Sequence, residues 1–119
     1  MSQSISRYSD AELEEFRLLI VDRYQKTKEE LEDLRAQIME INENLADEFG
    51  QDYMDDSSVA TDLEMLNNMS IRKRKYLQEL ENALIRIKNK TYGVCAITGE
   101  LIDKARLRAV PTTTKSLLG

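Results

Sequence analysis

The sequence predicts a mainly α-helical protein, built as a long antiparallel coiled-coil hairpin with a small C-terminal lobe. Two long stretches carry apolar residues at helical spacing, and the pattern lapses between them at about residues 48–60. The 119 residues include one Pro, four Gly and no Trp, and 33% are charged. This composition suits exposed helices better than a sandwich or barrel. We expect residues 1–8 to form a flexible arm, 9–90 the hairpin and 91–119 the lobe.

The first helix has a recognisable start and a repeated apolar seam. Ser9-Asp10-Ala11-Glu12 is a capping box, in which Ser9 and Glu12 each accept a hydrogen bond from the other's backbone amide. The seam residues, spaced alternately by four and three from Ile20 onward, are Leu13, Phe16, Ile20, Tyr24, Thr27, Leu31, Leu34, Ile38, Ile41 and Leu45. Such a seam is typical of a coiled coil. The helix is predicted from Asp10 to about Asp47, with Gly50 beyond its end.

A second heptad-like pattern follows, and it can begin at Ser58 or at Thr61, each a suitable N-cap. Its seam residues are Leu63, Leu66, Met69, Lys73, Tyr76, Leu80, Leu84 and Ile87. Two helices joined by a short connection can bury facing seams only by turning back on each other. The sequence therefore predicts an antiparallel pair.

Charge is distributed unevenly along the chain, whose net charge is −5. Residues 1–70 hold six basic and 18 acidic side chains, whereas residues 71–119 hold eleven basic and four acidic ones. Residues 36–71 contain nine Asp or Glu and no Lys or Arg, so the hairpin tip is predicted to be acidic. Pairing between the helices accounts for part of this opposition. The tip carboxylates Asp52, Asp55 and Asp56 either keep the loop solvated or meet a cation or a basic surface of a partner.

The run Arg72-Lys73-Arg74-Lys75 invites a nucleic-acid interpretation. Four consecutive helical residues point around most of the circumference and cannot form one flat patch. A solvated face that pairs with the acidic first helix is favoured, with a phosphate or nucleotide ligand as the alternative. Direct DNA binding is not favoured because the chain is acidic overall.

Residues suited to catalysis or metal binding are scarce. The chain has no His and one Cys, Cys95, so a Cys/His zinc set cannot form within one chain, and no phosphate-binding glycine loop is present. We expect a protein that is not an enzyme and binds no cofactor. A lone Cys, with no export signal and no long apolar run, favours a cytoplasmic protein that does not enter a membrane.

The C-terminal segment resembles the DksA/TraR family, whose terminal lobe is a four-cysteine zinc finger. The residues that match are Tyr92, Gly93, Cys95, Gly99, Ile102, Arg106, Leu107, Ala109, Pro111 and Thr112. In the register of that match the four zinc-ligand positions are Cys95, Thr98, Ser116 and Gly119. The resemblance implies a lobe that keeps the zinc-finger frame without the zinc.

The same register places Asp52, Asp55 and Ser57 on the family's coiled-coil tip motif, DxxDxA, with Ser in place of Ala. The resemblance implies a bacterial transcription regulator that inserts its coil into the secondary channel of RNA polymerase and modulates initiation, often with the stringent-response alarmone ppGpp. It suggests these contacts to polymerase or nucleotide: Arg72, Lys88, Lys90 and Arg106. Glu79 and Val110 stand where the best-known member has basic residues, which argues against ppGpp dependence.

Two other classes of function stay open. The chain is alternatively a coiled-coil adaptor or homodimer, or a transcript-cleavage stimulator of the Gre type, which has a similar shape and places tip acids on the catalytic metal.

Overall fold

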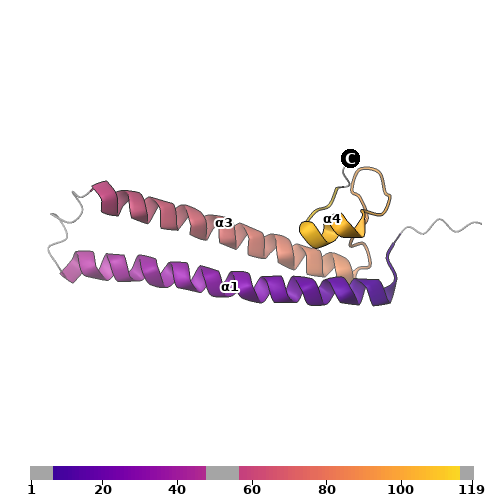
Figure 1. Ribbon diagram of the computed structural model, residues 1–119, viewed down its shortest axis with the longest axis horizontal. Coiled ribbons are helices and arrows are strands. Elements are labelled where there is room, and N and C mark those ends of the chain that lie inside the picture. The colour runs from indigo at the N-terminus through magenta and orange to yellow at the C-terminus, as the bar shows by residue number, and fades with distance from the viewer. Residues whose placement is uncertain (1–6, 48–56, 116–119) are drawn as a thin grey trace, which may run out of the picture. The chain divides into compact units, whose positions relative to one another are not determined.

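The computed structural model describes residues 7–47 and 57–115, and within its helices the side chains of residues 45–47 and 57 are not described. Three helices are present in this part of the chain (Figure 1): α1, Asp10–Asp47; α3, Ser57–Lys88; and α4, Lys104–Ala109. α1 and α3 lie side by side in antiparallel orientation, which confirms the predicted hairpin. α3 begins at Ser57, one residue before the earlier of the two predicted starts. The predicted end at Gly50 lies outside the described residues.

The start of α1 confirms the capping box. The amide of Ser9 donates to Glu12 Oε1 at 3.0 Å, and the amide of Glu12 donates to Ser9 Oγ at 3.1 Å. Tyr8, at the end of the segment predicted as a flexible arm, is buried and only 7% exposed. Residues 1–6 of that segment lie outside the described residues. An apolar residue just before an N-cap commonly packs onto the first turns of its helix.

The end of α3 is a Schellman motif. The amide of Lys90 donates to the carbonyl of Ile87 at 3.0 Å, and that of Thr91 donates to the carbonyl of Arg86 at 2.8 Å. Lys90 has a φ of 63°, in the left-handed region where such motifs usually place glycine. The turn directs the chain from α3 into the lobe.

The lobe, residues 91–115 in its described part, is built mainly from turns. Val94 and Leu101 form an isolated antiparallel bridge, and the amide of Ile102 donates to the carbonyl of Gly93 at 2.7 Å. Gly99, with a φ of 76°, occupies the tight turn between these segments. The amide of Ala96 donates to the carbonyl of Thr114 at 2.7 Å, which ties the C-terminal stretch to the start of the lobe.

The chain divides into two compact units, each described separately below. The base unit comprises residues 1–25 and 78–119, and the coil unit comprises residues 26–77. The start of α1 and the end of α3 therefore belong to the same unit as the lobe. This division of the chain differs from the expected boundary at residue 90. The buried side chains of the base unit are mostly apolar or aromatic: Tyr8, Leu13, Phe16, Ile20, Leu80, Ala83, Ile87, Tyr92, Cys95, Ile102, Leu107 and Pro111.

Fewer side chains are buried in the described part of the coil unit: Thr27, Leu31, Leu34 and Ser70. The seam residues nearer the hairpin turn, Ile38, Ile41, Leu63 and Leu66, are only half-buried. Ser70 and, in the base unit, Ala83 are buried seam residues that the apolar pattern did not include. No helix within residues 7–47 and 57–115 is long and apolar enough to span a bilayer.

Candidate functional site

The tip residues Asp52 and Asp55 lie outside the described residues, and so do the other residues of the connection, 48–56. Ser57 is the first residue of α3. The helices on either side end and begin at Asp47 and Ser57. The prediction that the tip carboxylates are effectors thus stays a prediction.

Arg72 lines a groove on the coil unit. The groove measures about 490 Å³ and is lined by Met65, Met69, Arg72, Lys73 and Tyr76 of α3. Lys73 Nζ is 3.0 Å from Glu30 Oε1 of α1, so one member of the basic run does pair with the acidic first helix, as expected for a solvated face. Arg72 has no hydrogen bond or ion pair to another described residue and is available to a partner.

The three remaining candidate contacts lie in the base unit. Lys88 is an exposed residue at the end of α3. Lys90 Nζ is 2.5 Å from Asp10 Oδ1, so this lysine links the end of α3 to the start of α1. Arg106 Nε donates to the carbonyl of Lys115 at 3.0 Å, which holds the C-terminal stretch against α4. Of the three, only Lys88 has no such internal role.

The residues present do not fit a zinc ion. Of the four positions that correspond to zinc ligands, Cys95 is the only thiol, and its Sγ accepts a hydrogen bond from the amide of Thr98 at 3.4 Å. The Thr98 hydroxyl accepts from the amide of Glu100 at 3.2 Å. Ser116 and Gly119 lie outside the described residues. Zinc prefers thiolate, imidazole and carboxylate ligands, and no cluster of three such side chains occurs in the described residues.

Aromatic packing and hydrogen bonds hold the lobe against the start of α1. The hydroxyl of Tyr92, a fully buried residue, donates to the carbonyl of Pro111 at 2.8 Å. The Phe16 ring lies between two tyrosines, with ring centroids 5.4 Å from Tyr92 and 5.9 Å from Tyr8. The Tyr8 hydroxyl donates to the carbonyl of Ile102, 94 residues away in the chain. Burial raises the pKa of Tyr8.

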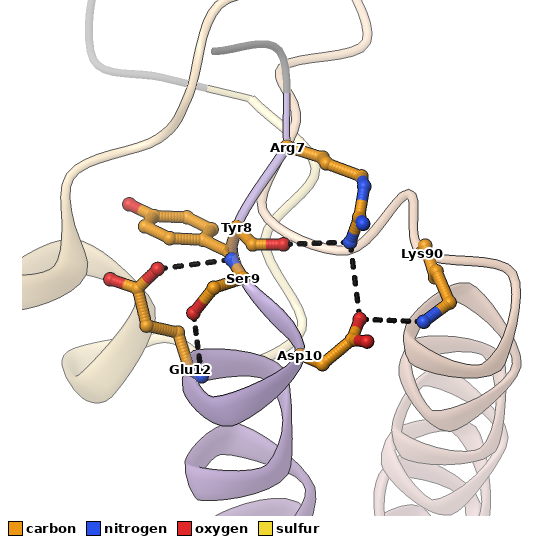
Figure 2. A network of polar contacts seen from close by, with 6 residues as sticks. All are labelled: Arg7, Tyr8, Ser9, Asp10, Glu12 and Lys90. Carbon is orange, nitrogen blue, oxygen red and sulfur yellow. Dashed lines mark hydrogen bonds and ion pairs between the residues drawn. The ribbon is translucent and has the colours of Figure 1, made fainter.

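Sequence reasoning missed the polar network around Tyr8, which Figure 2 shows. Asp10 lies between two cations, 3.3 Å from Arg7 Nη1 and 2.5 Å from Lys90 Nζ, and hydrogen bonds to Lys90 and Arg7 lower its pKa. Glu12 pairs with Lys104 of α4, and this bond, followed by those from Ser9, lowers the pKa of Glu12 to about 2. The available signal was the aromatic residue directly before the capping box.

Comparison with known proteins gives the family. The family model for the prokaryotic dksA/traR C4-type zinc finger matches residues 90–116. The RNA polymerase-binding transcription factor DksA of Caulobacter vibrioides is 31% identical over 109 residues, which cover 92% of this chain and 73% of that protein. A protein of Aquifex aeolicus is 32% identical over 98 residues, covering 75% and 68%.

A solved structure shares the fold. The transcription factor DksA2 from Pseudomonas aeruginosa is similar with a TM-score of 0.77 and 24% identity, over 91% of this chain and 79% of that one. This likeness supports the coiled-coil hairpin with its C-terminal lobe. The 31% identity to the Caulobacter protein shows that the chain belongs to the DksA/TraR family.

Proposed function

We propose that this protein is a transcription regulator that binds RNA polymerase and has no catalytic activity of its own. The observation that carries the proposal is the 31% identity to an RNA polymerase-binding transcription factor over 92% of the chain. Polymerase is the partner and the cytoplasm the place of action. The acidic first half of the chain does not favour direct DNA binding.

The proposed mechanism uses the coil to deliver the tip. The hairpin enters the secondary channel of polymerase, and Asp52 and Asp55 act near its magnesium-containing centre to modulate initiation. A protein of net charge −5 with an acidic connection is electrostatically suited to a basic pore. Arg72, on an open groove, and the exposed Lys88 are the basic side chains best placed to contact polymerase or a nucleotide.

The test is in vitro transcription with purified polymerase, with and without the protein, comparing the natural chain with Asp52→Asn/Asp55→Asn. The double substitution removes charge at nearly constant volume, so stability should change by no more than about 0.5 kcal/mol. It should abolish most of the effect on initiation and leave polymerase binding largely intact. Ser57→Ala, which restores the usual family residue, should be tolerated. Asp62→Asn/Glu64→Gln, two exposed acids of α3, is the matched control and should retain activity.

Other outcomes separate the alternatives. Full activity of Asp52→Asn/Asp55→Asn at matched polymerase occupancy would indicate that the tip carboxylates only keep the loop solvated. RNA cleavage in stalled elongation complexes would indicate a Gre-type stimulator. Self-association without polymerase capture would indicate an adaptor or homodimer.

Alarmone dependence is a separate question for the same assay. Glu79 and Val110, both exposed, replace basic residues of the best-known relative, so we expect the effect on initiation to be independent of ppGpp. Addition of ppGpp should leave the response unchanged. A response that appears only with ppGpp would overturn this expectation.

A further inference from the structure

A second groove on the coil unit lies between α1 and α3, away from Arg72. Its volume is about 550 Å³, within the range of about 300–1,000 Å³ that small-ligand sites occupy. The residues that matter most come from both helices: Arg35, Met39 and Asn42 of α1, and Asn67, Ser70 and Arg74 of α3. All of them belong to the coil unit.

Ser70 lines the groove at the seam between the helices. It is a seam residue, 6% exposed, at a point where a leucine would fill the space between the helices. Its hydroxyl is buried and has no hydrogen-bond partner in the structure. A buried hydroxyl without a hydrogen-bond partner costs free energy, so Ser70 contributes neither a hydrogen bond nor a large apolar side chain to the seam. The small side chain of Ser70 lines the groove without filling it.

The groove has two chemically different ends. Because the helices are antiparallel, Arg35 and Arg74 lie at one end, and Asn42 and Asn67 lie about 10 Å further along, two helical turns away. Met39, 60% exposed, lies between the two ends. The groove therefore presents cations, then an apolar surface, then amides.

Within the described residues the two arginines are not paired with a carboxylate. Neither Arg35 nor Arg74 makes a hydrogen bond or ion pair with another described residue. Two like charges at one end of a groove repel each other, and an anion held between two guanidinium groups would remove that repulsion and gain charge-assisted hydrogen bonds. The end beside Asn42 also carries Glu43, which disfavours a second anionic group there.

We propose that this groove is a binding site for a small organic anion with an apolar body. A carboxylate, sulfonate or phosphate lies between Arg35 and Arg74, and an aromatic or aliphatic body covers Met39 and Ser70. A neutral polar group at the far end meets the amides of Asn42 and Asn67. The site is separate from the tip, and binding requires no polymerase, so it stands or falls independently of the proposed function.

The test uses the full chain and 1-anilinonaphthalene-8-sulfonate, which combines a sulfonate with aromatic rings. Fluorescence titration gives the affinity, and NMR of the side-chain amides locates the probe. We expect saturable binding that shifts the amide signals of Asn42 and Asn67. Arg35→Gln/Arg74→Gln should weaken binding at least tenfold. Lys28→Gln/Lys75→Gln, which removes two exposed positive charges elsewhere on the coil unit, should change it less than twofold.

Two substitutions at Ser70 test the space itself. Ser70→Leu should fill the groove and abolish binding, with helicity measured by circular dichroism to show that the hairpin persists. Ser70→Ala keeps the space and should retain binding within about threefold. Because this substitution adds no atoms, it should fold even if Ser70→Leu does not. Unchanged affinity in Arg35→Gln/Arg74→Gln, an equal loss in Lys28→Gln/Lys75→Gln, or saturation without shifts at Asn42 and Asn67 would each overturn the proposal.

Discussion

The base unit and the coil unit use the same two helices in different ways. In the base unit three aromatic rings, Tyr8, Phe16 and Tyr92, pack in sequence, and Ile20, Leu80, Ile102 and Leu107 are completely buried. In the described part of the coil unit Thr27 and Ser70 are half of the buried residues. Large apolar side chains that are more than half exposed occur in both units: Met39, Met65 and Ile71 in the coil unit, and Leu18, Ile85 and Ile97 in the base unit.

This difference in burial indicates how stability and recognition are divided between the two units. Buried apolar area is the main favourable term in folding, so the base unit should supply most of the free energy of unfolding. A segment with few buried contacts opens at lower cost and has surface available for partners. We therefore expect the hairpin to be more stable at its base than along its coil.

The largest expected effect is the loss of an aromatic ring from the base unit. Tyr8→Ala should lower the free energy of unfolding by about 3–5 kcal/mol, the usual cost of removing a buried aromatic ring. Met39→Ala, in the coil unit, should change it by no more than about 0.5 kcal/mol because the side chain is exposed. Urea denaturation followed by circular dichroism measures both. Equal losses would contradict the contrast between the units.

Comparison of alanine substitutions at Gly93 and Gly99 tests the packing of the Tyr8 ring. Gly93 and Gly99 both have positive φ, 80° and 76°, so alanine is strained at either position, by about 1–3 kcal/mol. A Cβ at Gly93 would also lie 2.7 Å from two ring carbons of Tyr8, whereas a Cβ at Gly99 would meet nothing within 4 Å. Gly93→Ala should therefore destabilise the protein more than Gly99→Ala in the same urea titration.

The excess should depend on the ring. In the Tyr8→Ala background the difference between the two glycine substitutions should shrink, as a double-mutant cycle would show. If the excess at Gly93 persisted without the Tyr8 ring, close packing of the N-terminal segment would not be its cause.

Acid should weaken the base unit. Hydrogen bonds lower the pKa of Glu12 to about 2, and that of Asp10 is also lowered. A carboxylate whose pKa is depressed on folding stabilises the fold above its unfolded pKa, about 4.3 for Glu, and the contribution is lost as the pH falls toward the folded value. The midpoint of thermal unfolding should fall between pH 4.3 and 2, less steeply in Glu12→Gln. Glu64→Gln, on the coil unit, should keep the full slope.

The smallest expected effect is that of metal removal. Because Cys95, Thr98 and their neighbours do not fit zinc, the lobe should depend on apolar packing, and chelation should leave the unfolding midpoint unchanged. Elemental analysis of the purified protein checks the same point. One stoichiometric zinc per chain, lost together with helicity on chelation, would contradict it.

Local pattern determined the helices. The capping box at Ser9 and Glu12, and the heptads that follow, involve residues within a turn or two of each other, so their spacing in the sequence sets which side chains share a face. The residues around Cys95 carry a family resemblance that can also be recognised from sequence alone. The comparisons then showed that family. The candidate tip, Asp52 and Asp55, also came from sequence and stays a prediction.

Only the tertiary structure decided which segments meet across long stretches of chain. The sequence does not show that the Tyr8 hydroxyl donates to the carbonyl of Ile102. It also does not show that Lys90, a predicted polymerase contact, pairs with Asp10. The sequence pattern gives no reason to single out Ser70. Its place beside a groove becomes visible only when α1 and α3 are packed together. These contacts join residues far apart in sequence, and spacing along one segment does not encode what another segment brings to it.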